Sequence, residues 1–172
     1  MSEFLKKNPE ELEENLIKLM NKDWALVTVR DEKSGEFGTM TASWGCFGEL
    51  WNKPVFICYI RPQRYTYGLA ANTDRISLCF FDEQWREALR FCGRKSTRDV
   101  DKFKECGFTA KMSESGCAYI DESRLVILGR KLYEDDLKEE CFLVPDILKN
   151  YEKKDYHRFY ICEIEDVLVK ES

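Results

Sequence analysis

The stretch GTMTASWG, from Gly38 to Gly45, carries a hydroxyl side chain at every second position. Along an extended strand, successive side chains point to opposite faces, so the three hydroxyls are expected to share one face. That face is either simply solvated, since threonine favours strands, or it holds a ligand together with the backbone beneath it. The pattern therefore predicts a strand with Thr39, Thr41 and Ser43 on a hydroxyl face and Met40, Ala42 and Trp44 on a core face.

Apolar runs and turn signals predict a sheet around this strand. Further strands are expected at 24–29, 54–60, 76–81, 117–120, 125–133 and 159–168. Helices are expected at 8–22, 67–71, 84–92, 98–106 and 144–151, the first opening at Asn8-Pro9 and two others ending at Gly93 and Gly107. Strands come in runs rather than alternating with helices. This order predicts a mainly β fold, an antiparallel β-barrel with added helices, in a single domain over residues 1–172.

Composition limits the class of protein. With 32 acidic against 27 basic residues the net charge is −5, which disfavours general binding to nucleic acid or to an anionic membrane. No apolar run approaches the roughly 20 residues that cross a bilayer. The N-terminal residues lack the apolar core of a signal peptide, so a cytoplasmic protein is expected.

The cysteines do not predict a metal site. Eight cysteines and one histidine are present, and no two cysteines have C-x-x-C spacing. Cys58, Cys79 and Cys162 lie inside apolar runs, where cysteine acts as a small hydrophobic residue. Eight thiols indicate a reducing compartment.

Several common catalytic motifs are missing from the sequence. It contains no G-x-G-x-x-G, no G-x-x-x-x-G-K-[ST] and no G-x-S-x-G, which disfavours the usual dinucleotide folds, P-loop proteins and one large hydrolase class. A cysteine–histidine enzyme would have to use His157, which lies in a charged stretch beside Tyr156 and Arg158.

The stretch RPQRYTY, residues 61–67, suits an anion. Arg61, Arg64 and Thr66 lie where a strand is expected to end and a short helix to begin. A helix start offers unpaired backbone N–H groups, and guanidinium groups add charge-assisted hydrogen bonds, so a phosphate fits this corner. The alternative is that both arginines pair with local carboxylates at the surface.

A second anion-suited stretch is CGRKSTRDVDK, residues 92–102. Ser96, with Asp99 three residues later, resembles a capping box, and Arg98 and Lys102 bring positive charge near the same helix start. An ordinary capped helix with intrahelical ion pairs is the alternative. Together with the hydroxyl strand, these stretches describe a flat ligand that carries phosphate. The aromatic residues available to face its rings are Trp44, Trp51, Tyr65 and Tyr67.

Four motifs occur in one order: T-M-T-A-S-W-G at 39–45, W-x-K-P-V at 51–55, R-P-x-R-Y-T at 61–66 and C-G-x-x-S-x-R-D-x-D-K at 92–102. In this order they resemble the flavin reductase-like, FMN-binding split-barrel family. The similarity runs from Asn8 to Val167, nearly the whole chain. It implies a six-stranded antiparallel split barrel and a homodimer with FMN at its interface.

The resemblance also implies roles for individual residues. The segment 40–44 would lie along the isoalloxazine ring of FMN, residues 64–66 would lie near its phosphate, and residues 96–102 would border the flavin. His157 and Lys102 are the catalytic candidates, as a donor and a cation that stabilise negative charge on the reduced ring. The expected cofactor-binding set is Thr39, Met40, Thr41, Ala42, Ser43, Trp44, Arg61, Arg64, Tyr65, Thr66, Ser96, Arg98, Asp101 and Lys102.

Three positions depart from the family pattern. Gly38 stands where asparagine is usual, and Thr97 and Cys162 each stand where glycine is usual. The side-chain contact of that asparagine is therefore expected to be lost or moved.

The implied activity is that of an NAD(P)H:flavin oxidoreductase, in which a nicotinamide passes hydride to bound FMN. One alternative is an FMN-containing electron-transfer protein that is reduced by a redox partner protein and does not turn over NAD(P)H. Another is a non-catalytic split-barrel binding module. A different ligand, such as pyridoxal phosphate or haem on a similar barrel, is the remaining alternative.

Overall fold

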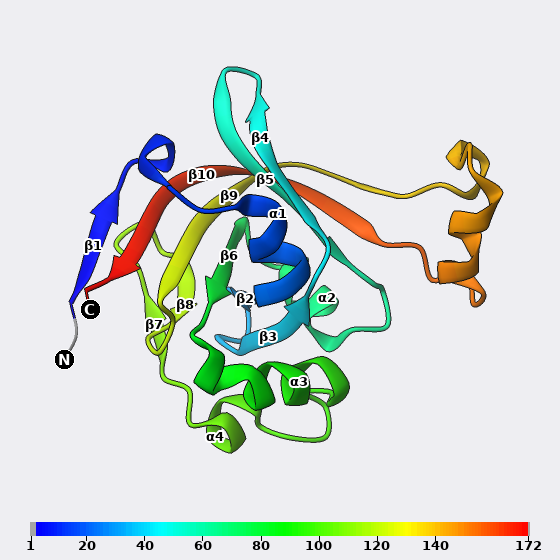
Figure 1. Ribbon diagram of the computed structural model, residues 1–172. Helices are drawn as coiled ribbons and strands as arrows, with labels where there is room; N and C mark the ends of the chain where they lie inside the picture. The colour runs from blue at the N-terminus through cyan, green and yellow to red at the C-terminus, as the bar shows by residue number, and fades with distance from the viewer. Residues whose placement is uncertain (1–2, 172) are drawn as a thin grey trace.

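The apolar runs form one antiparallel sheet of eight strands in the computed structural model, which describes residues 3–171 (Figure 1). Its strands are β1 (Phe4–Lys7), β2 (Ala25–Arg30), β3 (Phe37–Ala42), β4 (Gly45–Leu50), β5 (Lys53–Ile60), β6 (Arg75–Phe80), β9 (Leu125–Asp136) and β10 (Arg158–Lys170). The order along the sheet is β3-β2-β6-β9-β10-β5-β4, and β1 pairs with β10 outside this path. A separate pair joins β7 (Ala110–Met112) to β8 (Ala118–Ile120). The predicted mainly antiparallel β fold is confirmed, with eight strands in the large sheet in place of six.

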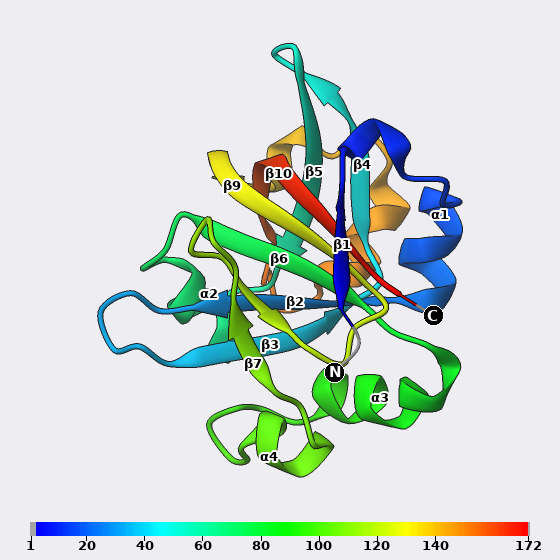
Figure 2. The same cartoon turned by 90° about the vertical axis from the view of Figure 1, so that its left-hand side faces the viewer.

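Helices cover the ends of this sheet. They are α1 (Leu16–Lys18), α2 (Tyr65–Ala70), α3 (Arg86–Arg94) and α4 (Lys102–Cys106), with a π-helical turn at Leu19–Asp23 and 3-10 turns at Pro9–Glu11, Glu83–Trp85, Glu139–Cys141 and Pro145–Tyr151. Figure 2 shows α3 and α4 below β3, and α1 beside β4. α3 packs on β3 and α2 packs on β2 and β3, so helices surround the strand that carries the hydroxyl row.

The prediction of one continuous N-terminal helix over 8–22 was wrong, because the helix is interrupted. Asn8 does cap a helical start, since its side chain accepts a hydrogen bond from the Glu10 N–H and its own N–H donates to Glu11. That start lasts only one 3-10 turn, because Leu12 is extended and packs against the core. The helix begins again at a second cap, Asn15.

The strand predicted over 38–45 ends at Ala42, and a new strand, β4, begins at Gly45. The two edges of the sheet therefore meet at Ser43 and Trp44. A Cβ on Gly45 would lie 2.8 Å from Met20 Cε and 3.2 Å from the Ile57 carbonyl oxygen, so a larger residue would have to displace Met20 at this entry into β4. Met40 and Ala42 are buried as predicted, but Trp44 is 47% exposed and is not a core residue. The strands β1, β4 and β7 were not predicted.

The helices around 92–106 also differ from the prediction. α3 continues through Gly93 to Arg94, so that glycine does not end it. Asp101 caps α4 by accepting from the Lys104 N–H, and Ser96 belongs to a preceding turn. The predicted end of α4 at Gly107 is confirmed.

Two apolar clusters lie on opposite faces of the sheet. Along β2, Ala25, Val27 and Val29 pack into one cluster, and Leu26 packs into the other with α3. Each fully buried large apolar side chain contributes roughly 1.5–3 kcal/mol. Because both faces of β2 are covered, the adjoining edge strand β3 has a rigid support.

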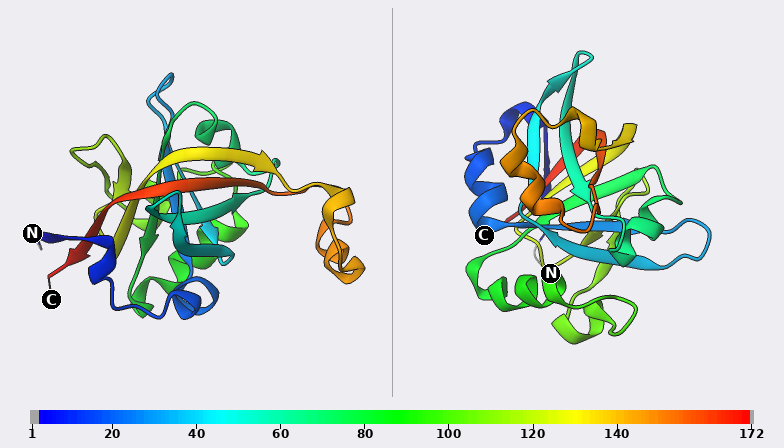
Figure 3. Two further views of the ribbon diagram at one scale, coloured as in Figure 1. Left: turned by 90° about the horizontal axis from the view of Figure 1, so that it is seen from above. Right: turned by 90° about the vertical axis from the view of Figure 1, so that its right-hand side faces the viewer.

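A long ribbon leaves the barrel where β9 and β10 extend beyond the other strands (Figures 1 and 3). We call residues 137–157, which join these two strands and carry two 3-10 turns, the arm. The arm folds back toward β5 and is held by an ion pair of 2.7 Å between Arg61 Nη1 and Asp155 Oδ2. It therefore brings His157, at its end, close to the loop between β3 and β4.

Gly129 in β9 provides a test of core packing. A Cβ on Gly129 would lie 2.4 Å from Phe56 Cε1, so Gly129→Ala should lower the free energy of unfolding by about 1–3 kcal/mol through overpacking. Chemical denaturation measures the change. Gly48→Ala is the matched control, since its Cβ would meet no atom within 4 Å, and a shift of at most about 0.5–1 kcal/mol is expected there. An equal loss in the two variants would contradict the close Gly129–Phe56 contact.

Candidate functional site

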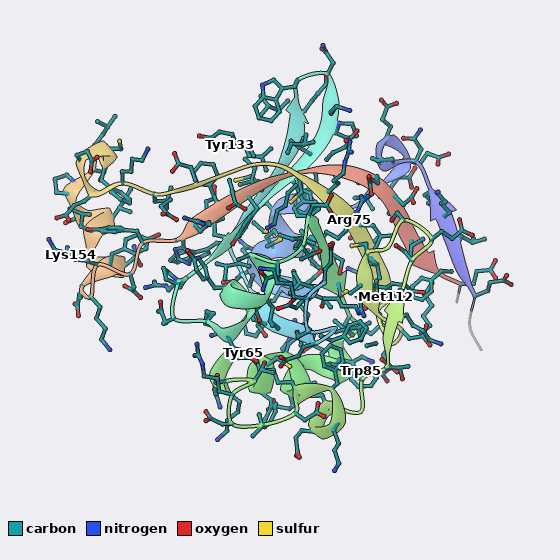
Figure 4. All side chains as sticks on the ribbon, turned by 180° about the vertical axis from the view of Figure 1, so that it is seen from behind. Tyr65, Arg75, Trp85, Met112, Tyr133 and Lys154 are labelled. Atoms are coloured by element: carbon teal, nitrogen blue, oxygen red, sulfur yellow. The ribbon has the colours of Figure 1, made fainter. Side chains whose placement is uncertain are left out.

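Two cavities meet at Arg64. The first, which we call the strand cavity, has a volume of about 230 Å³ and is lined by Met40, Thr41, Ala42, Ser43, Trp44, Tyr59, Arg61, Arg64 and His157. The second, the cationic cavity, has a volume of about 190 Å³ and is lined by Gln63, Arg64, Tyr65, Thr66, Arg94, Lys95, Ser96, Thr97 and Lys102. Figure 4 shows Tyr65 where α2 faces the segment that runs from α3 to α4. A ligand that spans both cavities would meet aromatic side chains at one end and, beyond Arg64, a denser set of cations at the other.

The end of β3 and the residues after it form one wall of the strand cavity. β3 is an edge strand, so backbone groups on its outer side have no partner strand. The Thr39 carbonyl points to this outer side, because it accepts a hydrogen bond from Lys102 Nζ. Thr41 has the same alternation as Thr39, so its backbone N–H points outward too. Small side chains at Ala42 and Ser43 leave that edge open to a ligand.

The threonine hydroxyls of β3 serve the protein itself. Thr39 is fully buried, and its hydroxyl lies 3.1 Å from that of Thr28. The Thr41 hydroxyl donates to the Leu89 carbonyl in α3. Of the three hydroxyls in the row, only that of Ser43 is exposed. The interpretation of this face as simply solvated was therefore wrong, because Thr39 and Thr41 join β3 to its neighbours.

Arg64 and Lys102 hold the end of α3 in place. Arg64 donates to the carbonyls of Gly93, at 2.9 Å, and Cys92, at 3.2 Å. Lys102 Nζ donates at 2.9 Å to the same Cys92 carbonyl and at 2.9 Å to that of Thr39. Cations are favourable at a helix C-terminus, where carbonyl oxygens lack helical partners. Both positive charges are thereby fixed at the wall of the cationic cavity.

Burial lowers the pKa of both cations. Lys102 is 2% exposed, and burial lowers the pKa of its ammonium group to about 8, with Arg64 contributing in the same direction. Burial also lowers the pKa of Arg64. An anion placed between them would replace the lost hydration, so the pair is suited to a phosphate.

One buried polar group without a partner points to a ligand in the cationic cavity. The buried Thr97 hydroxyl oxygen has no hydrogen-bond partner within the described chain. Thr66 is 1% exposed and lines the same cavity. Buried polar atoms are normally paired, so the Thr97 hydroxyl is available to donate to an oxygen of a ligand in this cavity.

Arg61 lies elsewhere than the sequence suggested. It lines the strand cavity, where it pairs with Asp155 in the arm and donates to the Asn150 carbonyl at 2.9 Å. Its guanidinium carbon lies 5.1 Å from the centre of the Tyr151 ring. The alternative interpretation, pairing with a carboxylate, therefore describes Arg61, whereas Arg64 is free of such a pair within residues 3–171.

His157 faces the strand cavity and is 7% exposed. Its Nδ1 lies 2.7 Å from the Tyr151 hydroxyl, and its ring centre lies 5.3 Å from that of Trp44. Burial, reinforced by the charge of Arg61, lowers the pKa of His157 to about 4. The imidazole is consequently neutral near pH 7 and acts there as a hydrogen-bonding group rather than as a cation.

The remaining predicted residues are divided between the cavity and its surroundings. Ser96 and Tyr65 line the cationic cavity, and Arg98 lies beside it, with its guanidinium carbon 5.3 Å from the Tyr65 ring centre. Asp101 is exposed and caps α4 instead. Cavity-lining residues that were not predicted are Tyr59, Gln63, Arg94, Lys95 and Thr97. Tyr59 had a detectable signal, because it lies near the end of β5, two residues before the Arg61 that opens the anion-suited stretch.

The structure shows what surrounds each of the three positions that depart from the family pattern. A Cβ on Gly38 would lie 2.4 Å from Leu69 Cδ1, so Leu69 fills the space that a larger residue would need. Cys162 is fully buried beside Gly129. Thr97 contributes its unpartnered hydroxyl to the cationic cavity.

A larger apolar cavity of about 710 Å³ adjoins the strand cavity and shares Ser43, Trp44 and Tyr59 with it. It lies between α1, the start of β4 and the arm. Its apolar lining residues include Leu16, Ile17, Met20, Phe47, Leu137, Phe142 and Ile147.

All eight cysteines are free. No group of residues suited to hold a metal ion occurs within residues 3–171, and none of the helices there is long and apolar enough to span a bilayer.

Comparison with known proteins identifies similar domains. The model of the family described as "Flavin reductase like domain" matches residues 18–172. No curated protein sequence matches this chain.

Three solved structures are similar in fold. An FMN-binding protein from Thermus thermophilus with bound p-hydroxybenzaldehyde is 19% identical, with a TM-score of 0.69 over 96% of this chain and 81% of that one. Flavoredoxin of Desulfovibrio vulgaris (Miyazaki F) is 19% identical, with a TM-score of 0.68 over 86% and 69% of the respective chains. The FMN-binding domain of a flavin reductases-like enzyme from Shewanella baltica is 14% identical, with a TM-score of 0.68 over 98% and 78%. At these identities the likeness shows the fold, and it confirms the predicted fold class.

The pKa of His157 predicts how stability depends on pH. The folded value, about 4, lies below the ordinary value of 6.5, so between these pH values the unfolded chain binds a proton that the folded chain excludes. Stability should therefore fall as pH is lowered from about 7 to about 4, by up to about 3 kcal/mol from this group. His157→Gln should flatten that slope in denaturation measured at several pH values. An identical slope in both proteins would show that His157 titrates normally.

Proposed function

The chain belongs to the flavin reductase-like domain family, and on that premise we propose that it binds FMN and acts as an NAD(P)H-dependent flavin oxidoreductase. The observation that carries the proposal is the junction of the two cavities at Arg64. One has an open strand edge with aromatic walls, and the other has buried cations without carboxylate partners. A ligand with a flat ring system at one end and a phosphate at the other matches these two cavities.

The residues that line the two cavities are chemically suited to the phosphate and the ring system of FMN. Arg64, Lys102 and the unpartnered Thr97 hydroxyl would hold the phosphate, with Thr66 and Ser96 beside them. The outer edge of β3 and the residues after it would hold the ring system, with Trp44 and Tyr59 as walls. Bound FMN would supply the hydride chemistry, and the chain would supply orientation and electrostatics.

The two catalytic candidates have separate tasks in this proposal. His157 lines the strand cavity with its Nδ1 2.7 Å from the Tyr151 hydroxyl, and we assign the tautomer in which that hydroxyl donates to Nδ1 and Nε2–H is the donor toward a ligand. Lys102 lines only the cationic cavity, so its charge would act on the phosphate. His157 is therefore the residue that we propose to stabilise negative charge at the ring.

We also propose a homodimer with FMN at its interface. Ile17, Leu143 and Ile147 are 78%, 93% and 44% exposed, and Ile17 and Ile147 line the apolar cavity between barrel and arm. Contiguous exposed apolar surface is typical of protein interfaces. A second copy seated there would cover the apolar cavity and add a further wall to the strand cavity that adjoins it. The eight free thiols favour the reducing cytoplasm as the location.

Flavin uptake is the primary test of this function. The purified protein, or its apo form titrated with FMN, should show flavin absorption and quenched flavin fluorescence at one FMN per chain. NADH and NADPH added without oxygen should then bleach the flavin spectrum. Failure to take up FMN would overturn the proposal. Uptake without bleaching by either nucleotide would favour an electron-transfer protein reduced by a partner protein.

Lys102 predicts a pH dependence of FMN affinity. Its ammonium group, with a pKa of about 8, loses its charge as pH rises, so FMN affinity should fall above pH 8, by up to about tenfold per pH unit. Lys102→Arg keeps the charge and should remove this alkaline loss. Riboflavin, which lacks the phosphate, is the control ligand, and its affinity should not follow Lys102. An equal alkaline loss for both ligands would exclude Lys102 from phosphate binding.

A further inference from the structure

We propose that the exposed cations around the cationic cavity bind the phosphates of the nicotinamide dinucleotide and make NADPH, rather than NADH, the preferred electron donor. The inference rests on the proposed function and deepens it. It assigns a separate task to Arg94, Lys95 and Arg98, which we call the rim.

The rim belongs to a group of five cations that lack ion-pair partners. No member of this group forms a salt bridge with a carboxylate within residues 3–171; the members are Arg64, Arg94, Lys95, Arg98 and Lys102. Arg61, immediately beside the group, is by contrast paired with Asp155. The chain is acidic overall, with 32 acidic and 27 basic residues. An unpaired basic cluster in an acidic protein attracts anions to one place on its surface.

The carboxylates closest in sequence or contact do not neutralise this cluster. Asp101 accepts a hydrogen bond from the Lys104 N–H at 3.1 Å as the cap of α4. Glu36 accepts from the Tyr65 hydroxyl at 2.8 Å. Asp99 is exposed, and none of the three carboxylates lines the cationic cavity.

The number of positive charges indicates that the rim is not needed to bind the FMN phosphate. The buried pair, Arg64 and Lys102, carries two positive charges, which match the charge of about −2 on a phosphate monoester near pH 7. The rim adds three more positive charges, and a flavin mononucleotide has no further group to meet them. A second ligand rich in phosphate is therefore expected beside the first.

The position of the rim favours a dinucleotide as that second ligand. Arg94 and Lys95 are exposed but also line the cationic cavity, which joins the strand cavity at Arg64. A nicotinamide stacked on the outer face of a ring bound in the strand cavity would have its phosphates within reach of the rim, which lies on the other side of Arg64. Arg98 is held for this task by stacking on Tyr65 and by donating to the Gln63 carbonyl at 3.3 Å.

The number of rim charges favours NADPH over NADH. Both dinucleotides carry a pyrophosphate, and NADPH has in addition a 2′-phosphate with a charge of about −2. Three exposed cations exceed what a pyrophosphate alone requires. Arginine in particular binds phosphate through two parallel hydrogen bonds.

The test compares the two donors in the FMN-loaded protein. Wild-type protein should show a higher kcat/KM for NADPH than for NADH, and the double variant Arg94→Gln/Lys95→Gln should lower that preference by about fivefold or more, through KM rather than kcat. The matched control is Lys104→Gln, since Lys104 is exposed on α4, has no ion pair within the described chain and does not line the cavity. This control should keep the wild-type preference.

A binding readout separates the rim from turnover. Calorimetric titration should show tighter binding of 2′,5′-ADP than of ADP, with the difference lost in the double variant and reduced by added salt. Equal affinity for the two nucleotides, or a wild-type preference for NADH, would overturn the inference. FMN uptake measured on the same samples shows whether a negative result concerns the NADPH preference or the proposed function. A protein that binds FMN and oxidises both donors equally refutes only the NADPH preference, whereas absent FMN uptake refutes the proposed function.

Discussion

The site depends on one buried ammonium group. Lys102 Nζ joins the Thr39 carbonyl on the edge strand to the Cys92 carbonyl near the end of α3, at 2.9 Å each. A buried charge is costly unless it is hydrogen-bonded, so both carbonyls must remain in place for the fold to keep this cation inside. That requirement fixes α3 against β3 and, through the Cys92 carbonyl that it shares, aligns Arg64 at the cavity wall.

The two cavities that meet at Arg64 differ in the residues that line them. The cationic cavity is made of groups that follow the end of α3, where carbonyls, cations and hydroxyls gather. The strand cavity lies between the outer edge of β3, β5 and the end of the arm, where the rings of Trp44 and Tyr59 both lie beside that of His157. Burial keeps His157 neutral in one half, while Lys102 stays charged near pH 7 in the other. A single ligand with an aromatic and an anionic end satisfies both environments.

Residue patterns succeeded where local geometry decides the outcome. The apolar runs predicted the strands, because a half-buried or fully buried strand has to carry such a pattern. Asn8, Asn15 and Asp101 all act as helix caps, but only Asn8 was predicted as one, and the helix that it opens lasts one turn because Leu12 packs inward instead of continuing it. The alternation along 39–44 was correct up to Ala42. It failed at Trp44 because β3 ends at Ala42, so Trp44 lies in the connection to β4 and its side chain no longer follows the alternation of the strand.

The sequence by itself determined the strands, the antiparallel class and the two basic stretches that contain Arg64 and Lys102, because these follow from side-chain periodicity and composition. The tertiary structure alone decided which cations face a ligand. Arg61 and Arg64 are three residues apart in one motif, yet the folded arm brings Asp155 to Arg61, while α3 brings only carbonyl oxygens to Arg64. Charge neutralisation depends on contacts between segments that are distant in sequence, and no local pattern records those contacts.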